Sequence, residues 1–182
     1  MAIVVRLNQL VKIMSLGCRI SLFSLLVCNA VHAGIPLSKE SKLKAAYLFN
    51  FTKFIEWPDL GDSKPPAPIR ICLDDTSEFF EFLEQLVANR RVGKLKHSVV
   101  VLPLETASGC ELLFVSKGGK QITGQFNNTV IVADSPSIVF PDATMVFYIE
   151  NTRLRFQIDL KKIKLHNVVV SSELLKLASI KK

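Results

Sequence analysis

The sequence predicts a single compact α/β domain, with a mostly parallel central sheet flanked by helices and a C-terminal antiparallel hairpin and helix. Short, continuously apolar runs recur along the middle of the chain, at 69–73, 98–102, 111–115 and 129–133. Such runs, separated by amphipathic stretches, are typical of parallel strands covered on both faces. After Pro141 the pattern changes, because Thr144–Ile149 and Leu154–Ile158 alternate and are joined by turn residues, which indicates a hairpin. The length of 182 residues suits one domain with a short appendage.

The first predicted helix covers Lys39–Trp57, because apolar side chains recur there at helical spacing. Ser38 is a suitable N-cap and Pro58 a stop. Asp59–Pro68, with one glycine and several prolines, then reads as a loop.

A second amphipathic helix is predicted at Thr76–Asn89, where Asp75 and Glu78 form a capping-box pattern. A short helical stretch is expected to end at Phe126, and a last amphipathic stretch covers Ser172–Ile180.

The first 33 residues have the layout of a secretory signal peptide. Basic residues without any acid precede the apolar run Ile20–Val27. Small residues at Val31 and Ala33 then predict cleavage between Ala33 and Gly34. We therefore expect a leader, 1–33, and an exported domain, 34–182, with translation starting at Met1 or Met14.

Two other interpretations of this leader are weaker. A membrane anchor is disfavoured because Asn29, His32 and Pro36 interrupt the second half of the uncharged stretch. A lipoprotein signal at Cys28 is disfavoured because Val27 stands where a small residue is needed.

The charge of the chain is positive, with 23 Lys and Arg against 16 Asp and Glu. Three of the cations, Arg6, Lys12 and Arg19, belong to the leader, and most lysines of the exported domain are scattered. The densest group is Lys161–Lys164, and no basic patch interleaved with aromatic residues is visible. Nucleic-acid binding is therefore not expected.

Two cysteines, Cys72 and Cys110, remain after removal of a leader that contains Cys18 and Cys28. An even pair in an oxidising compartment favours a disulfide, which would stabilise the fold by about 4 kcal/mol in the chain-entropy model. The alternative is two buried, unpaired thiols, since free cysteine packs like a small apolar residue.

The exported sequence carries no motif of a known metal site or nucleophilic triad, and no cofactor is expected. Lys117–Lys120 could hold an anion on backbone N–H groups, but a plain strand-to-helix turn is the simpler interpretation. Asp74 and Asp75 could hold a cation, but Asp75 is better explained as a helix cap. These observations favour a binding or regulatory protein over an enzyme.

Two motifs near the ends of the exported domain resemble the YfiR family of bacterial periplasmic proteins. The opening motif is Lys44–Pro58 (KAAYLFNFTKFIEWP), and the closing motif is Ser171–Ala178 (SSELLKLA). Arg155–Asp159 resembles the strand that precedes the closing motif, so the likeness spans nearly all of 34–180.

The resemblance implies a periplasmic protein that represses a membrane-bound diguanylate cyclase through its periplasmic sensor region, lowering cyclic-di-GMP and biofilm formation. It also implies a homodimer, and an outer-membrane lipoprotein that can sequester the repressor. Cys72 and Cys110 stand where the family has a bridging pair. A second family disulfide has no cysteines here, and Asp142–Met145 replaces a Gly-Gly-Met segment.

Four residues of the opening motif are candidates for partner or ligand binding: Tyr47, Asn50, Phe54 and Trp57. They fall near one helical face, and core packing explains such a stripe equally well. Asn50 needs partners for its amide if it is buried, and Trp57 either covers the helix end or belongs to an exposed apolar patch.

Two other functions are possible on this sequence. One is a periplasmic sensor that binds a nucleotide or amino acid at the carboxyl ends of the strands. The other is an unrecognised enzyme that uses Asp74, Asp75 or Lys120.

Overall fold

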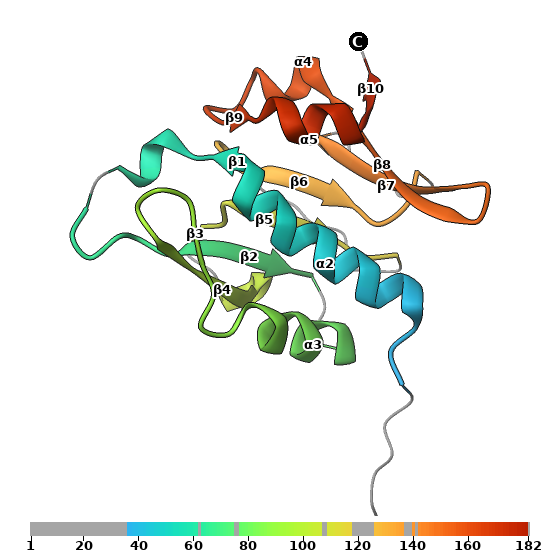
Figure 1. Ribbon diagram of the computed structural model, residues 1–182, viewed down its shortest axis with the longest axis horizontal. Helices are drawn as coiled ribbons and strands as arrows, with labels where there is room; N and C mark the ends of the chain where they lie inside the picture. The colour runs from blue at the N-terminus through green and yellow to red at the C-terminus, as the bar shows by residue number, and fades with distance from the viewer. Residues whose placement is uncertain are drawn as a thin grey trace, which may run out of the picture. The chain divides into compact units, whose positions relative to one another are not determined.

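A computed structural model describes residues 36–61, 63–74, 77–106, 109–117, 126–136, 140 and 142–181 (Figure 1). The contacts divide the chain into two units, Met1–Pro36 and Leu37–Lys182, and the account below concerns the second. The predicted leader and its cleavage between Ala33 and Gly34 lie outside the described residues, so the leader and its cleavage stay predictions.

An eight-stranded mixed sheet forms the centre of this unit, in the order β10-β8-β7-β6-β5-β2-β4-β3. The four predicted apolar runs are neighbouring parallel strands: β2 (Ile69–Leu73), β4 (His97–Pro103), β5 (Leu112–Val115) and β6 (Val130–Ala133). The predicted hairpin is β7 (Met145–Glu150) with β8 (Arg153–Asp159), and β7 continues the sheet parallel to β6. The predicted fold class is therefore confirmed.

Short strands that the sequence analysis missed complete the sheet and add a ribbon. At the edges, β3 (Arg91–Val92) runs antiparallel to β4, and β10 (Ser179–Lys181) runs parallel to β8. A separate ribbon joins β1 (Ile55–Glu56) to β9 (Val169–Val170). Runs of two or three residues show no periodicity, so only their long-range partners define them.

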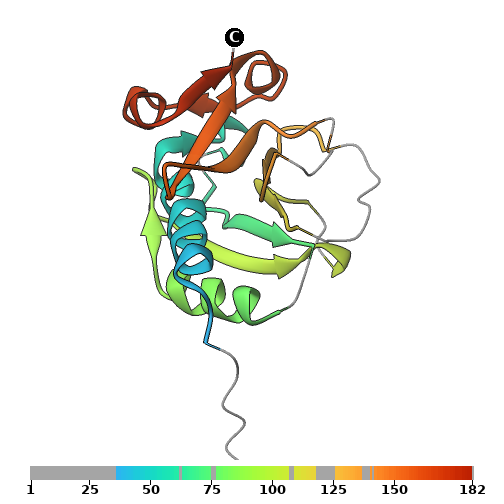
Figure 2. The ribbon, with the colours of Figure 1, turned by 90° about the vertical axis from the view of Figure 1, so that its right-hand side faces the viewer.

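Two longer helices, α2 (Lys39–Phe54) and α3 (Glu78–Val87), lie side by side against the sheet (Figures 1 and 2). Two short helices, α4 (Leu160–Ile163) and α5 (Ser172–Leu177), follow β8 and β9, and the 3₁₀ turns are η1 (Pro58–Leu60) and η2 (Leu104–Thr106). Among the described residues, no helix is long and apolar enough to cross a membrane.

Two helix boundaries differ from the predictions, one because of strand pairing with a distant segment and one because a residue nearer to the helix provides the N-cap. Helix α2 ends at Phe54, not Trp57, because Ile55 adopts an extended conformation and pairs with Val170 of β9. Helix α3 begins at Glu78 with Ser77 as its cap, since the Ser77 hydroxyl accepts from the Phe79 N–H. The observed cap is thus Ser77, and Asp75 lies outside the described residues.

The apolar side chains on the two sides of the sheet belong to separate clusters. The larger one joins the sheet to the helices, and its largest fully buried members are Phe51 of α2, Phe147 of β7 and Phe156 of β8. The smaller one contains Cys72, Leu113 and Ile131, packed against loop residues that include Leu104, Phe126 and Phe140. In the described part of the chain, loops rather than helices therefore cover the smaller cluster.

Candidate functional site

The two sequence motifs, more than a hundred residues apart, meet in space. Strand β1 at the end of the opening motif pairs with β9, which immediately precedes the closing motif. The Ser171 N–H donates to the Phe54 carbonyl at 2.9 Å, and the Ser171 hydroxyl caps α5 by accepting from the Leu174 N–H. We call this region, residues 54–57 and 168–171, the motif junction; Figure 1 shows its two ribbons together.

Three of the candidate residues lie on α2, where they pack against the core or bond within the helix. Tyr47 is half-buried among aromatic rings, with ring centroids 5.4 Å from Phe156 and 5.9 Å from Phe147. Phe54 is partly buried against the main core. Asn50 is also partly exposed, and its Oδ1 accepts from Lys53 Nζ at 2.9 Å, so its amide oxygen is satisfied within the helix. No ligand role for these residues is visible, and their part in partner binding stays a prediction.

Trp57 lies beyond α2 and is 7% exposed, so it packs in the core rather than in an exposed patch. Its indole Nε1 is buried and has no hydrogen-bond partner among the residues that the structure describes. Such a group is costly, and it marks a place where an acceptor would be stabilising. Trp57 lines two hollows, one on the side of Arg70 and one on the side of the β3–β4 turn.

A polar network holds the turn that follows Trp57. The Asp59 carboxylate accepts from Asn128 Nδ2 at 2.6 Å and from Asn167 Nδ2 at 2.7 Å. The Asn167 N–H also donates to Asn128 Oδ1 at 3.2 Å, which closes the triangle. Three loops from distant parts of the sequence are thereby connected beside the motif junction. Sequence analysis missed this network, because its members are far apart in the chain and carry no local motif.

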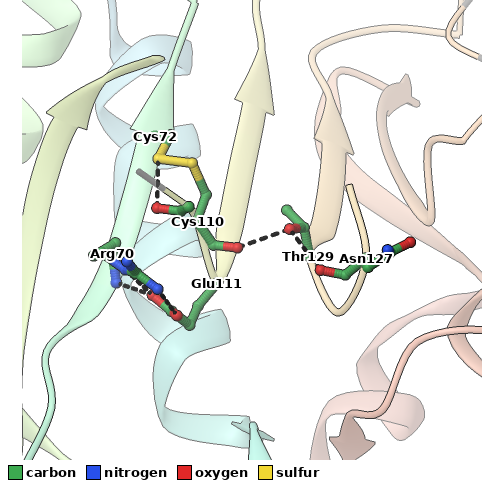
Figure 3. The surroundings of a disulfide bond; sticks show 7 residues. Arg70, Cys72, Cys110, Glu111, Asn127 and Thr129 are labelled. Carbon is green, nitrogen blue, oxygen red and sulfur yellow. Dashed lines mark hydrogen bonds and ion pairs between the residues drawn. A yellow bond between two sulfur atoms is a disulfide. The ribbon is translucent and has the colours of Figure 1, made fainter. Parts of the chain in front are cut away.

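The predicted disulfide between Cys72 and Cys110 is present and ties β2 to the loop before β5, with Cα atoms 5.8 Å apart (Figure 3). Cys72 is completely buried. The Cys110 carbonyl also accepts from the Thr129 hydroxyl at 2.8 Å, so the bridge is linked to the start of β6. This arrangement is structural, since it joins three neighbouring strands at one end.

An ion pair between Arg70 and Glu111 lies next to the disulfide (Figure 3). Glu111 Oε1 is 2.6 Å from Arg70 Nη2, and Oε2 accepts from Arg70 Nε at 2.9 Å and from the Arg70 N–H at 2.7 Å. Because the guanidinium donates to Glu111, the pKa of Arg70 is raised despite its partial burial. Gly109 lies beside this guanidinium at φ +139°, a backbone conformation that other residues rarely adopt.

A cavity of about 440 Å³ opens between these groups at the amino ends of the parallel strands. Trp57 and Phe126 contribute aromatic surface, and the ion pair and the Asp59 network contribute polar groups. This volume falls in the range of small-molecule sites, roughly 300–1,000 Å³.

The carboxyl ends of the strands, where the sequence analysis placed a possible ligand site, hold a smaller hollow of about 130 Å³. Asp74 is buried, and both its oxygens accept from the Ser116 N–H at 3.0 and 3.1 Å. Lys44 forms ion pairs with Asp134, at 2.6 Å, and with Glu40. Burial lowers the pKa of Lys44, but the two carboxylates outweigh it, and the net shift is upward. This hollow is thus lined by groups that pair with one another.

The other residues considered for chemistry do not come together in the described structure. Asp75 and Lys120 lie outside the described residues. His97 Nδ1 is 2.7 Å from the Ala67 carbonyl, and His166 stands in a different turn. Within the described ranges, no group of three or more His, Cys, Asp or Glu is placed to hold a metal ion.

Comparison with known families identifies one model, described as YfiR/HmsC-like, that matches residues 41–179. The match covers both motifs and every strand of the sheet except the last residues of β10. A search of curated proteins found no match.

Proposed function

Because the chain belongs to the YfiR/HmsC-like family, we propose that it is a periplasmic repressor without chemistry of its own, which binds the periplasmic sensor region of an inner-membrane diguanylate cyclase. The family match over 41–179 is the observation that carries this proposal. The Cys72–Cys110 disulfide supports an extracytoplasmic location, because such bonds persist in oxidising compartments.

Repression of this kind needs only a modest difference in affinity. A regulator that binds the inactive conformation of the sensor better than the active one shifts the balance toward the inactive state. If the two states start near balance, tenfold repression requires about 1.4 kcal/mol of differential binding. An exposed apolar surface of a few residues is sufficient for such a difference.

We propose that the motif junction, together with the turn at Leu165 that precedes it, contributes that surface. Val169 of β9 is 55% exposed and pairs with Glu56 of β1, and Leu165 in the preceding turn is 82% exposed. Exposed apolar side chains next to a ribbon held by both family motifs are suited to a protein partner. Trp57, the buried residue that follows Glu56, would position the ribbon rather than contact the partner.

The test is to express the chain together with a candidate cyclase and to measure cyclic-di-GMP. Wild-type protein should lower the nucleotide, and Leu165→Ser with Val169→Thr should relieve repression while leaving the melting temperature unchanged. Ile149→Thr is the matched control, since Ile149 is 54% exposed near the β7–β8 turn and outside the junction. Unchanged cyclic-di-GMP on deletion of the gene, with the cyclase expressed, would contradict the repressor proposal.

A homodimer and sequestration by an outer-membrane lipoprotein are further parts of the proposal that family membership supports. Light scattering of the purified protein tests the first. Co-purification with a candidate lipoprotein, using the Leu165→Ser and Val169→Thr variant for comparison, tests the second.

A second candidate function is small-ligand sensing, which the cavity beside Trp57 favours. Its volume of about 440 Å³ and its lining of aromatic and polar side chains suit a small molecule. Trp57 is the only tryptophan, so its fluorescence reports on this cavity directly. Titration with nucleotides and amino acids should change the emission if the chain is a sensor of these classes, and an unchanged emission and melting temperature would exclude them.

A further inference from the structure

The edge hairpin β3–β4 carries an unusual concentration of positive charge. The seven residues from 90 to 96 include four exposed cations: Arg90, Arg91, Lys94 and Lys96. Sequence analysis missed this group and identified Lys161–Lys164 as the densest, although a local cluster of cations was visible. We call residues 90–96 the basic hairpin.

Three cations of the basic hairpin lie at the turn that holds one exposed apolar side chain. Leu95 is 43% exposed at the turn, between Lys94 and Lys96. Arg91 reaches the same turn, because its Nη1 donates to the Lys96 carbonyl at 3.2 Å. The turn is tight, with Gly93 at φ +70° and Lys96 at φ +61°, and Lys94, Leu95 and Lys96 are exposed on it.

The described acids nearby offset this charge only in part. In the described part of the chain, none of the four cations forms an ion pair with a carboxylate. Glu84 lines a hollow together with Arg90 and Arg91, and Glu56 lines the groove that holds Lys94 and Leu95. Lys53 faces the same groove and offsets Glu56, so the surface stays strongly positive.

We propose that the basic hairpin binds the anionic surface of a phospholipid bilayer. Each lysine or arginine near such a surface is attracted by its negative potential, and a flanked apolar residue can enter the headgroup boundary. Lys94 and Lys96 are exposed at the turn and Arg91 reaches it, so a flat anionic surface can meet several of these charges together. A protein partner would instead need a matching concave, acid-lined site. Binding to lipid would hold a repressor close to a membrane-bound partner, and only this last consequence rests on the proposed function.

Vesicle co-sedimentation tests the proposal with protein recovered from the periplasm. The probes are vesicles of phosphatidylglycerol mixed with phosphatidylcholine, and vesicles of phosphatidylcholine alone. Wild-type protein should bind the first and not the second, and binding should weaken steeply as salt is raised from low to physiological strength.

Two double variants distinguish binding by the basic hairpin from an effect of the protein's net charge. Lys94→Gln with Lys96→Gln should weaken binding about 25-fold, at about fivefold per charge. Lys161→Gln with Lys164→Gln removes the same charge from exposed residues near α4 and should change binding less than twofold. Leu95→Ser should weaken binding severalfold at constant charge. Melting curves of all variants check that each is folded.

Three results would overturn the proposal: no binding to phosphatidylglycerol vesicles at low salt, equal losses in the two double variants, or binding to soluble polyglutamate without binding to vesicles. The last would assign the basic hairpin to an acidic protein. None of these results bears on repression, which is measured with the cyclase as described above, so the two proposals can fail separately.

Discussion

Replacing Glu111 by alanine should destabilise the protein more than any exposed charge change. Glu111 is 6% exposed, and its carboxylate accepts three hydrogen bonds from Arg70, two from its guanidinium and one from its backbone N–H. Removing one partner of a buried ion pair costs about 3–5 kcal/mol, because the other charge is left without compensation. The Arg70 side chain is 30% exposed, and water will satisfy part of it, so we expect a loss of about 2–3 kcal/mol.

Chemical denaturation followed by Trp57 fluorescence measures this loss. At about 2–4 °C per kcal/mol for a domain of this size, the melting temperature should fall by about 4–12 °C. Glu150→Ala is the control, since Glu150 lies 3.9 Å from Arg155 and both side chains are about half exposed, and it should change stability little. Arg70→Met combined with Glu111→Leu should recover most of the loss, because neither charge then remains buried alone.

A loss below about 0.5 kcal/mol for Glu111→Ala would refute this reasoning, since surface substitutions commonly fall within that range. It would mean that Arg70 is solvated as well without its partner as with it. A double variant as unstable as Glu111→Ala would refute the second part, because the cost would then arise from lost packing rather than from an isolated charge.

Three further predictions follow from buried groups. Cys72→Ala with Cys110→Ala should lower the free energy of unfolding, measured by denaturant titration, by about 3–4 kcal/mol. Thiol titration of the unfolded, unreduced wild type should find neither of these two cysteines free, and two free thiols there would contradict the bridge. Burial lowers the pKa of His166 below its usual 6.5, although Asp142 opposes this shift, so the unfolded state binds more protons and the free energy of unfolding should fall as pH drops below about 6.5. His166→Gln should flatten this pH dependence in melting curves recorded between pH 7.5 and 5. An unchanged slope would exclude His166 as its cause. Thr144→Val should lower the free energy of unfolding by about 1–3 kcal/mol in chemical denaturation, because the buried Thr144 hydroxyl accepts from the Ile131 N–H and donates to the Ile131 carbonyl, each at 3.0 Å. An unchanged free energy would mean that the Ile131 backbone finds other partners.

The sequence analysis predicted the sheet well, and it missed what depends on distant partners. The four apolar runs became neighbouring parallel strands because continuous burial on both faces leaves a strong local pattern. The helix expected to run to Trp57 ends at Phe54. The helical spacing of apolar residues continues past Phe54, but strand pairing of Ile55 with Val170 outweighs it. The cap of α3 is Ser77 instead of Asp75 for a local reason, since these two positions, two residues apart, both offer suitable side chains.

Composition and periodicity alone determined the class of the fold, the positions of its main strands along the chain and the one possible cysteine pair of the exported domain, because burial of apolar runs is a property of neighbouring residues. Only the tertiary structure placed Trp57 in the core, joined Asp59 to Asn128 and Asn167, and brought Glu111 onto Arg70. These contacts join residues separated by 41 to 108 positions, so no local pattern encodes them. They form because the parallel sheet aligns the amino ends of β2, β5 and β6, where polar loop residues must find partners or water.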